Sequence, residues 1–140
     1  MEQNTDPYVL DDQVGYLLRR VTQRHLHIFS EHIQDVTAMQ FACLVRLDQT
    51  GPMSQNLLGR AASMDAATVK GVVGRLELLG LVARQADPED RRRLTVALTD
   101  AGRDLVRRHY PAAAEITDAT LAPLSAEERR TLLALLQRLV

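Results

Sequence analysis

The chain has almost no cysteine and few aromatic residues. Cys43 is the only cysteine among 140 residues, which excludes an internal disulfide framework and any metal site built from several cysteines. Tryptophan is absent and aromatic residues make up 4% of the chain, whereas alanine and leucine dominate. This composition favours a mainly helical fold over a β-sandwich.

Two further absences concern membranes and secretion. The sequence has neither a secretory signal nor an apolar run long enough to span a bilayer, so we expect a cytoplasmic protein that does not bind membranes. Its length predicts one domain with a buried core. The formal net charge of −1 argues weakly against nucleic acid. The basic residues are clustered, however, so a DNA-binding face remains compatible with a nearly neutral chain.

Apolar residues at helical spacing predict most of the secondary structure. A long amphipathic helix is expected over residues 11 to 33, and its length suggests a role in assembly. A second helix is expected over 38 to 49 after Thr37, and a short one over 55 to 62 after Ser54. Asp65 caps the next helix, which stops at Gly80.

A β-hairpin and two more helices are expected in the second half of the chain. Residues 81 to 85 and 94 to 98 are predicted strands, joined by a charged loop. Thr99 starts a further helix, in which Pro111 predicts a kink or a break. Ser125-Ala-Glu-Glu128 is a capping box before the last helix. A helix followed by a hairpin with basic residues indicates a winged helix-turn-helix.

The helix after Asp65 carries residues suited to the major groove of DNA. Its first turns present Ala66, Thr68, Lys70 and Gly71, which are small or able to donate hydrogen bonds. Gly71 is expected to let the helix backbone approach the groove closely. Gly74 is expected to permit tight packing of this helix against the short helix. The opposite stripe is expected to be core and comprises Val69, Val72, Val73, Leu76 and Leu79.

Other basic and polar residues suit the DNA backbone. Arg60 and Arg75 are expected to contact phosphates, and Ser54 is either a plain helix cap or a cap that also binds phosphate. In the hairpin loop, three consecutive arginines can reach into a narrow, electronegative groove. They are Arg91, Arg92 and Arg93. We expect Asp87 or Asp90 to hold one of these arginines while Arg91 or Arg92 projects outward. The alternative is a solvated charged loop.

These features resemble the MarR family of bacterial transcription regulators over nearly the whole chain. The resemblance rests on three segments: Leu76-Glu-Leu-Leu-Gly-Leu-Val82, Asp87-Pro-Glu-Asp-Arg-Arg92 and Val96-Ala-Leu-Thr-Asp-Ala-Gly102. It implies a winged helix-turn-helix over residues 36–99, flanked by dimerisation helices over 8–34 and 100–140. It also implies a homodimer that binds a palindromic operator in double-stranded DNA, with repression as the family default.

A narrower resemblance suggests the effector. Arg20-Val-Thr-Gln-Arg-His25, Gln40-Phe-Ala42 and Met64-Asp-Ala-Ala-Thr-Val-Lys-Gly-Val73 are similar to regulators of aromatic and heteroaromatic acid catabolism, including nicotinate-pathway repressors. A pocket for such an acid needs an apolar slot, a ring hydrogen-bond partner and a cation. The candidate residues are Arg20, His25, Phe29, Met39 and Gln40, with Arg24 as a second candidate cation. The alternative for His25 is a satisfied core histidine.

Other classes of function have weaker support in the residues. A thiol redox switch at Cys43 is the alternative regulatory mechanism, although its apolar neighbours would raise the thiol pKa. No nucleophile, base and acid fall into a catalytic arrangement, so we expect neither an enzyme nor a cofactor. His25 and His32 contribute at most to an intersubunit metal site. The last alternative is a winged-helix interaction module that does not bind DNA.

Overall fold

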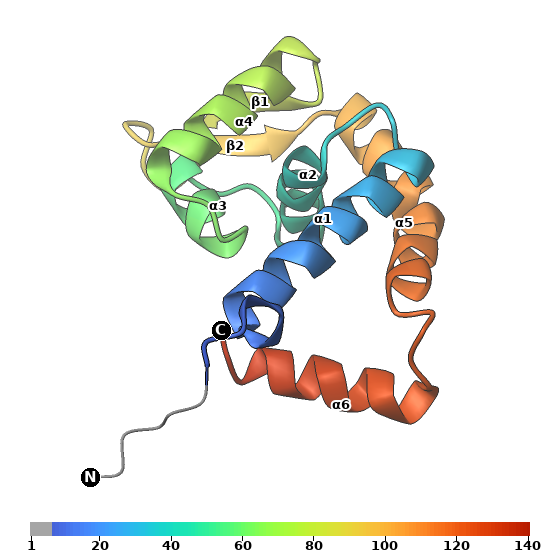
Figure 1. Ribbon diagram of the computed structural model, residues 1–140. Coiled ribbons are helices and arrows are strands. Elements are labelled where there is room, and N and C mark those ends of the chain that lie inside the picture. Colours follow the sequence, from blue (N-terminus) through green and yellow to red (C-terminus); the bar gives the residue numbers. More distant parts are fainter. Residues whose placement is uncertain (1–6) are drawn as a thin grey trace, which may run out of the picture.

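Helices of different lengths and one β-hairpin make up the described part of the fold, as the sequence predicts. The computed structural model describes residues 7–140 (Figure 1). Its elements are, in order, η1 (Leu10–Asp12), α1 (Val14–His32), α2 (Ala38–Thr50), α3 (Gln55–Ala61), α4 (Ala66–Leu78), β1 (Val82–Ala86), β2 (Leu94–Leu98), α5 (Asp100–Thr120) and α6 (Ala126–Gln137). The predicted fold class, mainly helical with a small hairpin wing, is confirmed.

Side-chain caps determine where most of these helices begin. Thr37 and Ser125 form capping boxes with Gln40 and Glu128, and each box satisfies two backbone donors. Ser54, Asp65 and Thr99 each accept a hydrogen bond from the backbone amide three residues later. The predicted caps are therefore confirmed.

One prediction about a helix boundary is wrong, and one of two alternatives at Pro111 is excluded. The first long helix starts at Val14 rather than residue 11, because Gln13 is extended and separates α1 from the 3-10 turn η1. Of the kink or break predicted at Pro111, the break does not occur, since α5 is continuous across it. Proline removes one hydrogen bond inside a helix. Leu105 and Ile116, on either side of Pro111, are both buried, so packing offsets that loss.

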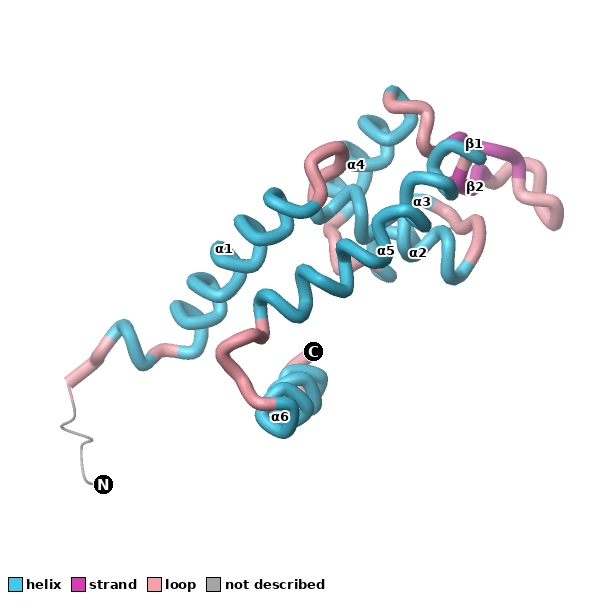
Figure 2. The backbone as a smooth tube through the Cα atoms, turned by 90° about the vertical axis from the view of Figure 1, so that its right-hand side faces the viewer, coloured by secondary structure: helices cyan, strands magenta, loops and turns pink. Residues whose placement is uncertain are grey.

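The winged unit occupies one end of the molecule and α6 the other (Figure 2). α1 and α5 lie side by side along the length between them. The core runs from this helix pair into α2, α3 and α4, and its fully buried residues are Ile33, Cys43, Leu44, Leu58, Val69, Val73, Leu76, Val96 and Val106. Leu79, expected in the core, is instead 44% exposed at the end of α4. No helix within residues 7–140 is long and apolar enough to cross a membrane.

The wing is attached to the rest of the fold by a close backbone contact. β1 and β2 pair antiparallel with Val82 opposite Leu98, and Met53 adds an isolated bridge to Val96. Gly80 has a φ of +73°, as a glycine that ends a helix should. Near the start of α5, a Cβ on Gly102 would overlap the carbonyl of Leu81. Only glycine therefore fits where α5 crosses the base of the wing.

Candidate DNA-binding surface and ligand-binding hollows

The N-terminal part of α4 presents small and polar residues to solvent. Ala66, Lys70 and Gly71 are exposed and Thr68 is half-buried, whereas Val69 and Val73 on the opposite side are fully buried. Asp65 accepts a hydrogen bond of 2.7 Å from the amide of Thr68. This bond holds the pKa of Asp65 below its usual range, so the cap is ionised and stabilises the N-terminal end of the helix, where the predicted base contacts lie.

The glycines of the helix-turn-helix have different roles from those expected. A Cβ on Gly74 would meet nothing within 4 Å, so the predicted tight packing of Gly74 against the short helix is wrong. Gly59 on α3 has that role instead, since its Cβ would lie 3.0 Å from Val69 Cγ1. Gly71 and Gly74 both border open space, and a DNA backbone can approach α4 closely there.

The residues predicted to contact phosphates lie on α3 and α4. Ser54 accepts from the amide of Leu57 at 3.2 Å, which is an ordinary cap and does not decide between its two interpretations. Arg60 and Arg75 are both exposed. Within residues 7–140, neither guanidinium has a hydrogen-bond or ion-pair partner. Both are therefore available to an anion.

The wing loop is held by its backbone rather than by its arginine side chains. Asp87 Oδ1 accepts from the amide of Glu89 at 2.9 Å, and Asp90 Oδ1 accepts from the amide of Arg92 at 3.1 Å. The prediction that an aspartate would hold an arginine side chain is wrong, because each carboxylate instead accepts from a backbone amide two residues further along the turn. Arg91, Arg92 and Arg93 are all exposed, and none has a side-chain partner within the described chain.

Arg84 on β1 is a residue that the sequence analysis missed. Its Nε donates to Glu77 on α4 at 2.9 Å, and its other nitrogen donates to Gln55 on α3 at 2.6 Å. Arg84 therefore links the wing to both helices of the helix-turn-helix. The sequence offered one signal, an arginine on a short strand close to basic DNA-binding segments, but no indication of its partners.

A small hollow lies between α1, α2 and α5 and contains His25. We call it the inner hollow; it measures about 220 Å³ and is lined by His25, Phe29, Ala38, Phe41, Ala42, Ala113, Ile116 and Thr117. Its walls are almost entirely apolar. Phe29 and Phe41 are tilted against each other with ring centroids 6.0 Å apart. This shape and chemistry suit the body of a single aromatic ring.

The hydrogen bonds around His25 fix its tautomer. Thr120 donates its hydroxyl hydrogen to the carbonyl of Ile116 at 2.8 Å, so this hydroxyl can only accept from a further partner. His25 Nδ1 lies 2.8 Å from the same oxygen and must therefore be the donor. In the neutral imidazole Nε2 is then unprotonated. His25 thus retains one acceptor nitrogen for a hydroxyl or ring N–H group.

The other predicted effector residues are not all brought together. Arg20 stacks over the ring of Tyr16, 5.9 Å from its centroid, and lines neither this hollow nor the next. Arg24 donates to the carbonyls of Thr120 and Ala119 at 2.6 and 3.0 Å, so its charge caps α5. Met39 is 49% exposed outside the inner hollow. Only His25 and Phe29 of the predicted set line it.

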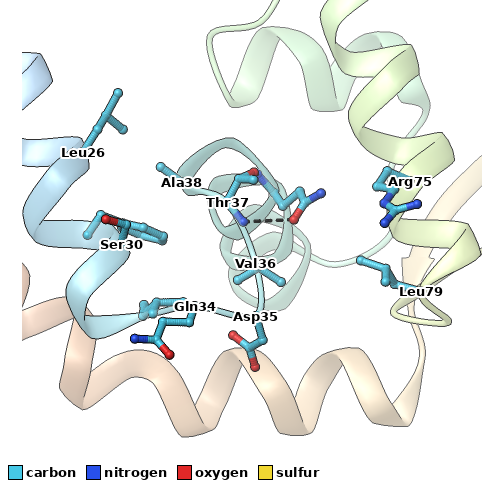
Figure 3. A pocket seen from close by; sticks show the side chains of 12 residues that line it. Leu26, Ser30, Gln34, Asp35, Val36, Thr37, Ala38, Arg75 and Leu79 are labelled. Atoms are coloured by element: carbon cyan, nitrogen blue, oxygen red, sulfur yellow. Dashed lines mark hydrogen bonds between the residues drawn. The ribbon is translucent and has the colours of Figure 1, made fainter.

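A larger hollow lies on the other side of Phe29, between α1, α4 and the segment that joins α1 to α2 (Figure 3). We call it the linker hollow; it measures about 600 Å³ and is lined by Leu26, Phe29, Ser30, Ile33, Gln34, Asp35, Val36, Thr37, Ala38, Gln40, Arg75 and Leu79. Phe29 and Ala38 line both hollows. Gln40 belongs here, and its side chain accepts from the amide of Thr37.

Cys43 is poorly placed for redox chemistry. The thiol is fully buried on α2 with Met64 Sδ 3.8 Å away. Burial raises the pKa of the Cys43 thiol to about 11, which keeps it protonated at neutral pH. Since the thiolate is the reactive form, the structure argues against the alternative redox mechanism.

Hydrogen peroxide is therefore expected to leave the DNA affinity of the protein unchanged. The measurement is operator binding before and after peroxide treatment, with mass spectrometry to follow oxidation of Cys43. Loss of binding that a thiol reductant reverses, and that Cys43→Ser abolishes, would restore the redox mechanism.

The histidines do not form a metal site within the described chain. No group of three or more potential ligands gathers anywhere in residues 7–140. His32 Nδ1 lies 2.9 Å from the carbonyl of Ile28, and His109 pairs with Asp35 at 2.8 Å. Each of these histidines has a local partner that accounts for its position.

Comparisons with known proteins agree with this geometry. The model of the MarR family matches residues 36–94. The chain is 40% identical over 136 residues to the HTH-type transcriptional repressor NicR of Pseudomonas putida, covering 96% of this chain and 86% of NicR. A probable transcriptional regulator from Pseudomonas aeruginosa is 51% identical, with a TM-score of 0.91 and coverage of 94% of this chain and 100% of that one.

A third relative connects the fold with a ligand. BpsR of Bordetella bronchiseptica, whose DNA binding is regulated by 6-hydroxynicotinic acid, is 41% identical with a TM-score of 0.90. The similarity covers 96% of this chain and 97% of that structure.

Proposed function

Since this chain belongs to the MarR family, we propose that it is a homodimeric repressor released from a palindromic operator by a small aromatic or heteroaromatic carboxylate. In this proposal the protein is a regulator rather than an enzyme, and it binds DNA in the bacterial cytoplasm. The observation that carries the proposal is a winged unit with free arginines beside an apolar hollow in which His25 retains an acceptor nitrogen. Repression by NicR and regulation of BpsR by 6-hydroxynicotinic acid support it.

The DNA-binding residues divide by the part of DNA that they suit. Ala66, Thr68, Lys70 and Gly71 on α4 are proposed to face bases in the major groove. The wing arginines are proposed to enter the adjacent minor groove. Ser54, Arg60 and Arg75 are proposed to contact the phosphates.

Homodimerisation explains an apolar surface that the single chain leaves uncovered. On α1, Val14 is 65% and Val21 is 51% exposed, and on α6 Leu135 is 50% exposed. α6 has no buried residue at all. An amphipathic helix of this length is marginally stable without a packing partner. We therefore propose that residues 8–34 and 100–140 form the dimer interface and that 36–99 form the DNA-binding unit.

The inner hollow is the proposed effector site. A ring would lie against Phe29 and Phe41, and a ring hydroxyl or N–H group would donate to Nε2 of His25. No lysine or arginine among residues 7–140 lines the inner hollow. In the dimer, Arg20 of the second subunit is the proposed partner of the carboxylate. Gln40 and Met39 stay outside this site, which revises the predicted set.

Ligand binding acts on DNA affinity by shifting the dimer between two arrangements. The ligand favours an arrangement in which the spacing of the two α4 helices no longer matches the operator. The shift cannot exceed the difference in the ligand's affinity for the two arrangements.

Release of the operator by one acid at micromolar concentration is the expected result of the main test. The operator is sought upstream of the protein's own gene, and the bound dimer is titrated with benzoates, hydroxybenzoates, cinnamates and hydroxynicotinates. His25→Ala is expected to raise the concentration needed for half-release by about tenfold, because it removes a hydrogen bond in an apolar hollow.

His27→Ala is the matched control, because His27 lies on the same helix but pairs with Glu31 at the surface. It should respond to the effector like the wild type. An operator complex that no acid dissociates would contradict the effector part of the proposal, and absence of any operator would contradict the repressor part.

A further inference from the structure

The two strands of the wing are attached to the helices unequally. In β2, Thr95, Val96 and Ala97 are buried, whereas β1 has Val82 as its only buried residue. Apolar packing therefore holds β1 at its first residue alone. Within residues 7–140, the side-chain hydrogen bonds that join β1 to α3 or α4 are the two that Arg84 donates.

Arg84 makes both of these bonds with one planar guanidinium. Nε donates to Oε1 of Glu77 at 2.9 Å, which is a charge-assisted bond, and Nη2 donates to Oε1 of Gln55 at 2.6 Å. Gln55 is the first residue of α3, and Glu77 lies near the end of α4. The donors of a guanidinium point in fixed directions, so acceptors on two different helices define the position of β1.

Exposure and charge indicate that Arg84 serves geometry rather than stability or phosphate binding. The side chains of Arg84 and Glu77 are 33% and 36% exposed, and solvent weakens the contribution of such an ion pair to the free energy of unfolding. Glu77 also neutralises the charge of Arg84. The three arginines of the wing loop have no such partner within the described chain, so they rather than Arg84 are available to DNA.

We propose that Arg84 is a positioning residue that fixes the wing relative to α4, so that the protein recognises the distance between a major-groove sequence and the neighbouring minor groove. This rests on the proposed function, in which α4 and the wing arginines enter adjacent grooves. The width of the minor groove depends on its sequence, and narrow segments attract arginine. A fixed wing meets a narrow segment at one distance from the α4 site, whereas a wing that can tilt accepts several.

The test compares two operator duplexes that differ in this distance. The first is the operator upstream of the protein's own gene, with its contacts located by footprinting. The second has one base pair inserted in each half-site between the α4 sequence and the minor-groove segment, and the two α4 sequences keep their separation. Wild type is expected to bind the second duplex about tenfold more weakly, as it would a mismatched base pair.

Arg84→Met is expected to lose most of this discrimination. It should distinguish the two duplexes by less than about threefold, since its wing can follow the displaced segment. It should also bind the first duplex about tenfold more weakly than the wild type does, because its wing must be ordered on binding.

Two further variants separate geometry from charge. Arg84→Lys keeps the charge but not the planar fork, so it should lose discrimination as Arg84→Met does. Gln85→Met is the matched control, because it places the same side chain at the next position of β1, where the backbone carbonyl alone accepts a bond, from Thr95. It should discriminate like the wild type. The salt dependence of binding should stay that of the wild type in every variant, since Glu77 already neutralises Arg84.

Backbone NMR relaxation of the free protein tests the link without DNA. The wing amides should become more mobile in Arg84→Met but not in Gln85→Met. Unchanged mobility in Arg84→Met, or wild-type discrimination by Arg84→Lys, would overturn the inference and leave the proposed function intact. A reduced salt dependence in Arg84→Met would assign Arg84 to a phosphate contact and overturn it as well. A wild type that binds no operator would overturn the proposed function and this role of Arg84 together, even if the wing proved mobile.

Discussion

Alanine at position 102 is expected to lower the free energy of unfolding by about 3 kcal/mol or more, as severe overpacking does. The added Cβ would overlap the carbonyl of Leu81, which is backbone and cannot move like a flexible side chain. The same region carries the hydrogen bond from Thr99 Oγ1 to the carbonyl of Gly80, at 2.7 Å. Displacing α5 to relieve the overlap would therefore disturb the start of α5 and the base of the wing together.

Urea denaturation followed by circular dichroism measures this loss. Gly71→Ala is the matched control, because its Cβ meets nothing within 4 Å in the middle of a helix. That change should be neutral or stabilise the fold by up to about 1 kcal/mol. Equal midpoints for Gly102→Ala and the wild type would show that α5 and the wing are not in the contact described.

Removing Arg91 and Arg92 together is expected to weaken operator binding strongly and to reduce its salt dependence. Both side chains are exposed and unpaired within the described residues, so nothing in the chain competes with DNA for them. A guanidinium in the minor groove also neutralises nearby phosphates and releases their counterions, so each arginine lost should reduce the slope of log affinity against log salt by up to about 0.9. The wing should keep its shape, because backbone amides rather than arginines satisfy Asp87 and Asp90.

Affinity is measured for the Arg91→Ala, Arg92→Ala and double variants over a range of salt concentrations. Arg129→Ala is the control, since Arg129 pairs with Asp118 at the other end of the molecule. Unchanged affinity and slope in all three wing variants would favour the interaction module that does not bind DNA.

Local signals in the sequence predicted the local parts of the fold. The caps Thr37, Ser54, Asp65, Thr99 and Ser125 act within one helical turn, so their residue types suffice to predict where helices begin. Local reasoning did not decide whether Pro111 breaks its helix, because that depends on the packing of Leu105 and Ile116 against the rest of the fold. Leu79 has the helical spacing of a core residue, but no element of the described fold covers its side chain, which is 44% exposed.

The candidate sites were less predictable because their partners are distant in sequence. His25 and Thr120 are 95 positions apart, and no spacing rule joins them. Arg24 has the charge expected of a residue that binds an acidic effector, yet its guanidinium donates to the carbonyls at the end of α5. Arg75 was correctly noticed as a basic residue, but only the arrangement of α1 beside α4 shows a hollow next to it.

The continuous helix α5 contacts the rest of the fold at both of its ends. At its C-terminal end Thr120 contacts His25, and at its N-terminal end Thr99 and Gly102 contact the base of the wing. A helix of 21 residues is about 31 Å long. Tilting such a helix by about 5° about one end moves the other end by nearly 3 Å, a displacement comparable to a hydrogen-bond length. In the proposed mechanism, a ligand beside His25 therefore moves the wing through α5 without contacting it.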